Sequence, residues 1–485
     1  MGVAFHFGQK VMPKVLINIG ALMDIPTATM VTGAKGETIY NGGLSQVTGI
    51  VGRGNTYKST IMHYMILSAA SKVNRVTPTA IATYDTEMNV SLDRLQSFAN
   101  DFEGLPSDMF SGEGAMWSVV DKATMPGNTW AVELKKYADE KVKDKSANIK
   151  IAPFKDPYTK GTLEVVTPSF VEIDSLTEFE AESTVEMLSK DLDSSDTNTF
   201  AMKQGMFKSK FLSQLPLTAN TSNLYIAVTA HVGDKIDMNA SPYAPKAPKD
   251  LQFLKQTDNI KGVGTKFFFL TNQAWITHTP SVLKNQTTKG PEYPLGSDDS
   301  TEPDLNLVML TMLRSKSGPS GCTIPLVISQ SEGVLPSLSE FHYIKENNRY
   351  GLDGNNINYN LFLYPECKLA RTTVRSKINN DPLLRRAINI TAELLQLEIY
   401  SNDIKQQGLL CSPKELYEDI KKLGYDWNVL LNTRGYWTID QYDNPVPFLS
   451  TVDLLKMRAG TYKPYWLEDT KNTKEKKQWK IITIQ

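Results

Sequence analysis

Residues 49–60 read GIVGRGNTYKST, and this stretch decides the fold that we expect. It matches the phosphate-binding loop pattern G-x-x-x-x-G-K-[ST] at Gly52, Lys58 and Ser59. The position before the lysine, where the pattern has glycine, holds Tyr57. A tyrosine is compatible with such a loop if the position keeps φ in a range that a non-glycine residue tolerates.

The sequence around the loop alternates between strand-like and helix-like runs. An apolar run of strand length at 45–52 precedes the loop, and the apolar spacing of 59–73 predicts a helix that packs on a sheet. A β-branched and alanine-rich run at 79–87 and an amphipathic run at 90–101 repeat this order. The order predicts an α/β domain with a mainly parallel twisted sheet flanked by helices.

Later runs extend the sheet and set the expected organisation of the chain. Strands are expected at 169–179 and 222–232, and the runs 305–316 and 322–334 predict a hairpin. We expect an N-terminal segment, an α/β core with two insertions, and a separate, mainly helical C-terminal region. The boundaries are 1–40, 41–345 with insertions at about 103–162 and 232–263, and 346–485.

The composition is that of an ordinary globular protein. Of 485 residues, 41% are apolar and 22% are charged, and the net charge is −1. A nearly neutral chain has no long-range attraction for nucleic acid, so any DNA contact must come from local clusters. No apolar run approaches the ~20 residues that span a bilayer, the first residues lack a signal-peptide pattern, and the three cysteines are far apart. We therefore expect a cytoplasmic protein with no membrane contact.

The loop itself predicts nucleotide binding. Backbone N–H groups in a glycine-containing turn at a helix N-terminus form a cradle for anions. Lys58 is expected to contact the outer phosphates, and Ser59, helped by Thr60, to hold Mg²⁺ through its hydroxyl. A chance match is the alternative, which the position between a strand and a helix disfavours. The expected nucleotide-binding residues are Gly52, Arg53, Gly54, Asn55, Thr56, Tyr57, Lys58, Ser59 and Thr60.

Two carboxylates follow predicted strands, where the sites of parallel sheets lie. Asp174, at the end of SFVEID, is expected to orient Mg²⁺ and its water; capping of the next helix is the alternative. Glu87, in TYDTEMN, is expected to be the general base that activates the attacking water. Strand ends often carry acids, and Asp85 shares the face of Glu87, so the pattern alone leaves this role open.

Three further side chains are candidates for contact with the nucleotide phosphates. His231 ends the strand AVTAH, where it is expected either to sense a γ-phosphate or to be structural. Arg314 and Lys316 alternate in a strand and so project from one face. They are expected either to reach the nucleotide of a neighbouring subunit, as arginine fingers do, or to form a solvated sheet edge.

Taken together, these motifs resemble the RecA family of ATPases, and most closely the phage UvsX-type recombinases. The resemblance rests on GIVGRGNTYKST, TYDTEMN, VEIDSL, AVTAHV and LRSKSG, and spans about residues 40–390. It implies a RecA-like P-loop core with ATP and Mg²⁺ as cofactors and ATP at subunit interfaces of a filament or ring. It also implies that Glu87 activates water, that His231 senses phosphate, and that Arg314 and Lys316 act across the interface.

The resemblance further implies two DNA-binding loops, near 184–200 and 232–263. The second loop holds lysines that can neutralise phosphates, together with Tyr243 and Phe253, which could stack on bases. A surface insertion is the alternative for this segment. The lysines are Lys235, Lys246, Lys249, Lys255 and Lys261.

The expected function is therefore that of a DNA-dependent ATPase that promotes homologous pairing and strand exchange in recombination and repair. Its partners would be single-stranded DNA, duplex DNA during exchange, further copies of the chain, and single-strand-binding and mediator proteins. A hexameric RecA-fold motor such as a DnaB-like replicative helicase is the alternative. A non-catalytic assembly protein on the same fold is a third reading, which the presence of Lys58, Glu87 and Asp174 disfavours.

Overall fold

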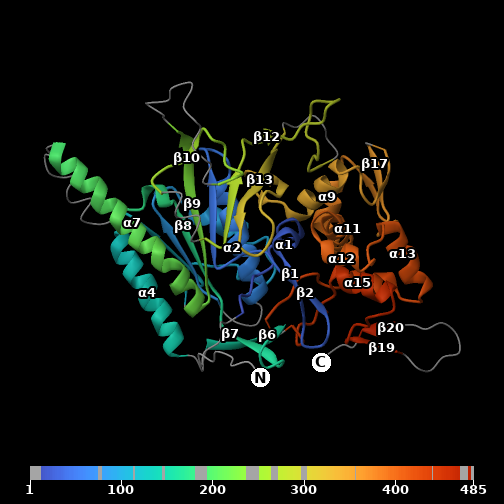
Figure 1. Ribbon diagram of the computed structural model, residues 1–485. Helices are drawn as coiled ribbons and strands as arrows, with labels where there is room; N and C mark the ends of the chain where they lie inside the picture. Colours follow the sequence, from blue (N-terminus) through green and yellow to red (C-terminus); the bar gives the residue numbers. More distant parts are fainter. Residues whose placement is uncertain are drawn as a thin grey trace, which may run out of the picture.

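The protein is described by a computed structural model as a mixed α/β structure. A large, mostly parallel sheet is flanked by helices (Figure 1), which confirms the expected fold class at that level. The residues that the structure describes are 13–74, 79–112, 115–144, 148–180, 194–235, 251–263, 271–296, 303–355, 357–439, 441–469 and 479–481.

The main sheet has 11 strands, and its parallel part runs in the order β11-β3-β9-β8-β4-β5. These strands are β3 (Val47–Gly52), β4 (Ile81–Asp85), β5 (Trp117–Asp121), β8 (Ser169–Asp174), β9 (Leu224–Asp234) and β11 (Gln273–Thr277). Antiparallel strands β13 (Leu305–Ser315), β14 (Thr323–Ser329) and β15 (Gly333–Val334) continue the sheet beyond β11. The short strands β10 (Asp258–Ile260) and β12 (Ser281–Val282) pair with β9 and β13. The predicted hairpin of β13 and β14 is confirmed.

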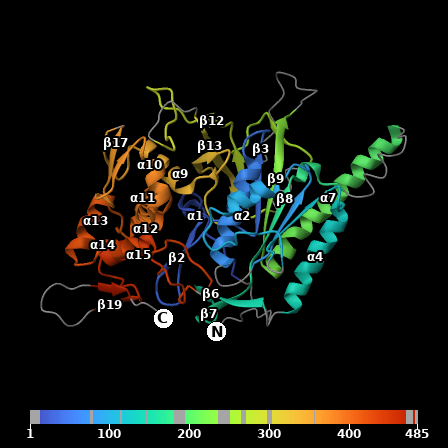
Figure 2. The ribbon, with the colours of Figure 1, turned by 180° about the vertical axis from the view of Figure 1, so that it is seen from behind.

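The inner parallel strands β3, β8 and β11 are buried along their whole length because both faces of the sheet are covered there. In β3, Ile50 belongs to one buried cluster, whereas Val47 and Val51 belong to the other. Helix α2 (Lys58–Asn74) packs into the first cluster. Helices α4 (Gly127–Lys143) and α7 (Ser194–Ser222) pack side by side into the second (Figure 2).

One of the two expected insertions is part of the sheet. Residues 103–162 contribute β5, which pairs in parallel with β4, and α4, which covers one face. Treating this range as an insertion was therefore wrong for residues 117–143. The remaining elements between β4 and β8 are α3 (Leu92–Ala99), β6 (Ile149–Lys155) and β7 (Thr162–Val166), and the turn η1 (Leu176–Glu178) follows β8.

The N-terminal segment and the C-terminal region pack against each other and against the core. The N-terminal elements are α1 (Ala21–Thr27), β1 (Thr29–Thr32) and β2 (Thr38–Asn41). The helices after the sheet are α9 (Pro336–Glu346), α10 (Val374–Asn380), α11 (Pro382–Tyr400), α12 (Asn402–Gln406), α13 (Pro413–Lys422), α14 (Trp427–Leu431) and α15 (Thr451–Arg458). Small strands lie among them: β16 (Leu352–Gly354), β17 (Asn358–Leu361), β18 (Lys368–Ala370), β19 (Leu467–Asp469) and β20 (Trp479–Ile481).

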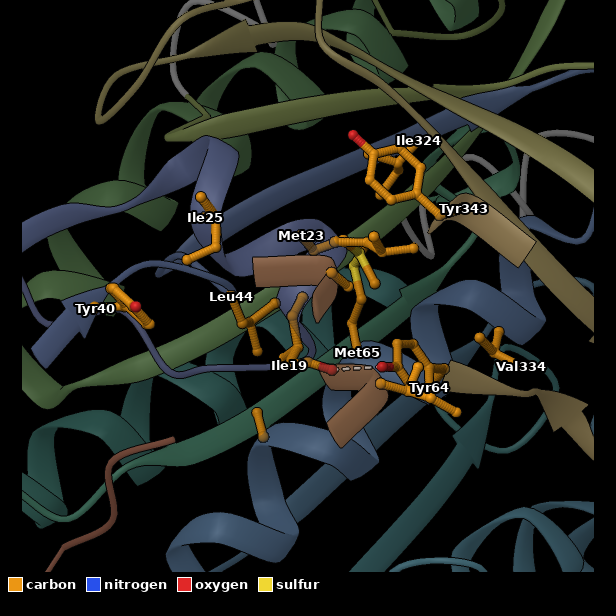
Figure 3. Close-up of a cluster of buried hydrophobic side chains, with 14 of the residues drawn as sticks. Ile19, Met23, Ile25, Tyr40, Leu44, Tyr64, Met65, Ile324, Val334 and Tyr343 are labelled. Atoms are coloured by element: carbon orange, nitrogen blue, oxygen red, sulfur yellow. Dashed lines mark hydrogen bonds between the residues drawn. The ribbon is translucent and has the colours of Figure 1, made fainter. Parts of the chain in front are cut away.

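The larger buried cluster runs without a break from the sheet into the C-terminal helices. The helical content expected after residue 345 is present, but these helices share the core of the sheet domain. Figure 3 shows part of this cluster, where the Tyr64 hydroxyl donates a hydrogen bond to the Ile19 carbonyl. The side chains that meet there include Ile19, Met23, Tyr64, Met65, Ile324, Val334 and Tyr343.

Within the described part of the chain, none of the helices combines the length and the apolar character that crossing a bilayer requires.

Candidate nucleotide site

The loop between β3 and α2 forms the floor of the site. Gly52 ends β3 and pairs with Thr277 on one side and His231 on the other. A Cβ at Gly52 would meet Thr277 Oγ1 at 2.0 Å, so the close approach of β11 requires glycine here. At Gly54 a Cβ would meet nothing within 4 Å. The start of the loop is therefore tightly packed, and its crest is open to a ligand.

Tyr57 has a positive φ, the backbone region that favours glycine. Its φ is 60°, in the left-handed region, which costs a non-glycine residue about 1–2 kcal/mol. The tyrosine therefore occupies a backbone region that a non-glycine residue reaches only at this cost. The tyrosine is held in place by other contacts, since its hydroxyl accepts a hydrogen bond from Asn306 Nδ2 at 2.9 Å and its ring packs on the larger cluster.

Lys58 begins α2 and points back over the loop. Its side chain is largely buried, and Nζ donates a hydrogen bond to the Arg53 carbonyl at 2.9 Å. Burial lowers the pKa of Lys58, and the carboxylates of Asp174 and Glu87 oppose that shift. An ammonium group placed in this way can exchange a carbonyl for phosphate oxygens.

Asp174 lies at the end of β8, beside the start of α2. Its carboxylate accepts a hydrogen bond from Thr229 Oγ1 at 2.5 Å and another from the Ser59 hydroxyl. Burial raises the pKa of Asp174, and these two hydrogen bonds work against the increase. The hydroxyl and the carboxylate expected to hold Mg²⁺ are thus in direct contact. Elsewhere in the described ranges, as here, no group of three or more His, Cys, Asp or Glu side chains could hold a metal.

Glu87 lies in a turn that Asp85 organises. The Asp85 carboxylate accepts hydrogen bonds of 2.9 Å from four successive backbone N–H groups, those of residues 87–90. Asp85 is therefore a structural residue that presents Glu87 to the cavity. Burial alone would raise the pKa of Glu87, but the hydrogen bond to His231 and nearby charges outweigh it, so the pKa is lowered.

His231 meets Glu87 directly. The distance from His231 Nε2 to Glu87 Oε1 is 2.8 Å. The strand does not end at the histidine, as the sequence suggested, but continues to Asp234. Because β9 lies between β3 and β8, His231 stands between the phosphate loop and Asp174.

These side chains surround one cavity of 960 Å³. It brings together Lys58, Ser59, Glu87, Asp174 and His231, all of which the sequence had assigned to a nucleotide site. The loop contributes residues 54–60 to the lining, but Gly52 and Arg53 lie outside it. The Arg53 guanidinium points elsewhere, toward Asp234 and Asp258.

Sequence reasoning missed His63, which also lines the cavity. His63 Nδ1 lies 3.0 Å from both carboxylate oxygens of the buried Glu172. Burial opposes protonation of His63, but the Glu172 carboxylate outweighs it and raises the histidine pKa. A signal was present, since His63 follows Ser59 by one helical turn and Glu172 shares a strand face with Asp174.

Arg314 and Lys316 lie at the end of the strands opposite to the phosphate loop. Ser315, which separates them, is paired with Gln273, whereas the loop begins beside Thr277, four residues and roughly 13 Å further along β11. The two cations therefore do not reach the cavity of their own chain. Burial and the neighbouring cations Arg314 and Lys14 lower the pKa of Lys316.

The residues expected to bind DNA are only partly described. Lys235, Lys255 and Lys261 are exposed near the paired ends of β9 and β10. Lys246, Lys249 and Tyr243 lie outside the described residues, as does most of the first expected loop, 184–200, whose residues 194–200 form the start of α7. Phe253 lies against Gly321, so its ring is not fully open for stacking.

No protein-family model matches the chain, and no curated protein matches its sequence. A functional assignment therefore rests on the residues and the geometry of the site.

Proposed function

We propose that this chain is a DNA-dependent ATPase of the RecA type, most like the UvsX recombinases, that pairs and exchanges DNA strands. The observation that carries the proposal is the convergence of Lys58, Ser59, Glu87, Asp174 and His231 on one cavity. These residues come from α2, β8, β9 and the turn after β4, so a chance match at the loop does not explain why they meet. The cavity volume of 960 Å³ is within the range of roughly 300–1,000 Å³ typical of ligand sites.

ATP and Mg²⁺ suit the groups that line the cavity. The loop crest and the N-terminus of α2 attract phosphate, and Lys58 can leave the Arg53 carbonyl to contact it. Ser59 and Asp174 offer hydroxyl and carboxylate oxygens, the ligand type that Mg²⁺ takes beside phosphates and water. A magnesium ion bound there would neutralise charge on the phosphates.

Glu87 is the proposed general base. A glutamate is ionised at neutral pH, and the Glu87 carboxylate lines the cavity, where it can accept a proton from water. The water oxygen forms a bond to the γ-phosphorus while the bond to the β–γ bridging oxygen breaks, and ADP and inorganic phosphate leave. His231 holds the carboxylate through the 2.8 Å contact.

A link to DNA is supported by the position of His231 on β9. Lys235 follows the end of this strand, and Lys255 and Lys261 flank β10, which pairs with it. A change in the Glu87–His231 contact on hydrolysis would therefore act on the strand that leads into the lysine-bearing segment. Exposed lysines of this kind neutralise backbone phosphates.

Two measurements on the wild-type chain test the proposal. We expect single-stranded DNA to stimulate MgATP turnover, and we expect electron micrographs with both ligands to show helical filaments. Closed hexamers would favour the helicase reading instead. A chain that forms no oligomer and whose ATP turnover ignores DNA would contradict both.

The position of Arg314 and Lys316 supports an action between subunits. A mixture of Arg314→Ala/Lys316→Ala subunits with Lys58→Ala subunits should recover part of the activity that each variant lacks, because each interface can then combine an intact loop with an intact pair. Recovery is measured as ATP turnover against mixing ratio. With no recovery at any ratio, the pair acts within its own subunit or not at all.

A further inference from the structure

Arg53 belongs to the loop by sequence but not to the cavity by position. Its Nη2 lies 2.6 Å from Asp234 Oδ1 and 3.2 Å from Asp258 Oδ1. Its Nη1 makes a longer contact of 3.4 Å with Asp234 Oδ2. One guanidinium thus bridges two carboxylates, both of which lie outside the cavity.

The two aspartates face each other across a strand pair. Asp234 ends β9, Asp258 begins β10, and the two are directly opposed in the antiparallel register. Like charges in opposed positions destabilise a strand pair. Arg53 offsets this repulsion, and the Asp258 side chain is only 6% exposed, so solvent screens that carboxylate poorly.

The backbone of Arg53, unlike its side chain, makes hydrogen bonds within the loop. Its carbonyl accepts hydrogen bonds from Thr56 Oγ1 at 2.8 Å and from Lys58 Nζ at 2.9 Å. A displacement of Arg53 would therefore move the carbonyl around which the phosphate cradle is arranged. One residue joins the nucleotide loop to the β9–β10 pair.

We propose that Arg53 is a coupling residue: through Asp234 and Asp258 it ties the shape of the phosphate loop to the pairing of β9 with β10. This inference rests on the proposed nucleotide site, whose regulation it specifies. The tie pre-forms the loop for phosphate, and by reciprocity a nucleotide in the loop stabilises the β9–β10 pair. The lysines that flank these strands then respond to nucleotide through the phosphate loop as well as through His231.

The test compares MgADP binding with hydrogen exchange at residues 257–261, in which Lys261 N–H donates to the His231 carbonyl. Arg53→Gln should weaken MgADP binding about five-fold or more and should speed exchange, because the opposed carboxylates lose their cation. Asp234→Asn/Asp258→Asn should weaken MgADP binding similarly without changing any loop residue. It should leave exchange slow in the nucleotide-free protein, because no like charges remain to repel each other.

A variant in which the two charges are swapped distinguishes loss of the ion pair from misfolding. Arg53→Asp combined with Asp234→Arg again places one arginine between two carboxylates, and it should recover MgADP affinity and slow exchange. Arg458→Gln, which removes the 2.9 Å contact to Asp419 between α15 and α13, is the matched control and should change neither. Wild-type MgADP affinity in both Arg53→Gln and the double asparagine variant, together with wild-type exchange in Arg53→Gln, would overturn the coupling.

Failure of the nucleotide site itself is separately visible. If the wild-type chain binds no MgADP, the ATPase proposal falls. In that case hydrogen exchange in nucleotide-free Arg53→Gln still tests the link between Arg53 and the β9–β10 pair. Faster hydrogen exchange that Arg53→Asp/Asp234→Arg reverses supports the link, and unchanged hydrogen exchange overturns it.

Discussion

Carboxylates withdrawn from full solvent exposure meet both in the cavity and in the packing between α1, α2, α9 and α11, and of these two places only the cavity has the form of a reaction site. In the cavity, Glu87 and Asp174 stand beside Lys58 around open space. In the seam between α1, α2, α9 and α11, Asp24 and Glu340 are 6% and 5% exposed and line no part of that cavity. Burial raises the pKa of Asp24 to about 7 and that of Glu340 to about 8.

The comparison shows that burial alone shifts the pKa of a carboxyl group, whereas a reaction site also needs open space for a ligand. Strongly shifted pKa values cluster at functional sites, yet the carboxylates of the seam also have clearly raised pKa values. Glu340 is held by Asn389 Nδ2 at 3.2 Å, and Asp24 by the N–H groups of Ile19 and Gly20. Those partners are groups of the protein itself, and neither carboxyl group lines the cavity. Access and convergence, rather than titration, single out the cavity.

The largest expected effect comes from removing the cation of the cavity. Lys58→Ala should abolish measurable MgATP binding, because the outer phosphates lose their charged partner inside a partly desolvated site. Calorimetric titration measures the affinity, and Lys289→Ala, at an exposed position, is the control. Wild-type affinity in a folded Lys58→Ala variant would contradict the placement of phosphate at this loop.

The next effect separates binding from chemistry. Glu87→Gln should bind MgATP as the wild type does but lose turnover by about 10²–10⁴-fold, since an amide cannot take the proton of the attacking water. Steady-state phosphate release measures the loss, and Glu418→Gln, on an exposed face of α13, should be neutral. Normal turnover in Glu87→Gln would remove Glu87 as the base.

The sequence predicted those parts of the candidate site that depend on residues close together in the chain. A loop between a strand and a helix, and acids at strand ends, depend on neighbouring residues, and Lys58, Asp174 and Glu87 were found in that way. The Tyr57–Asn306 contact joins residues 249 positions apart, and His63 meets Glu172 across 109 positions. Such pairings follow from strand order, which no local pattern contains.

The misjudged insertion has a similar physical cause. Strand β5 lies at the edge of the parallel part of the sheet, where only Trp117 among its five residues is fully buried. An edge strand lacks the continuous apolar run that marks β3 or β9. Helix α4 lies in the same range, and its apolar side is buried on the sheet through Trp130 and Leu134.

The last expected effect is on the stability of the fold and not on turnover, and it concerns the carboxylates of the seam. Glu340 has its pKa raised to about 8, so between about pH 4.5 and 8 the folded chain keeps a proton that the unfolded chain has released. The free energy of unfolding must therefore fall as pH rises through this window, by about 1.4 kcal/mol per pH unit from this group alone. Above about pH 8 the group is ionised in both states, so its effect on the free energy of unfolding no longer changes with pH.

Glu340→Gln should remove this slope while leaving MgATP turnover unchanged. Relative to wild type, the variant should gain stability steadily from pH 5 to pH 8 in denaturant titrations, and Glu418→Gln should run parallel to wild type. A variant that instead loses turnover would tie the seam to the cavity, because a shared helix, α2, carries Lys58 at one end and packs beside Asp24 through Tyr64 and Lys72. A difference from wild type that is the same at every pH would mean that Glu340 is ionised in the folded chain, and then burial would not be the cause that distinguishes the two groups of carboxylates.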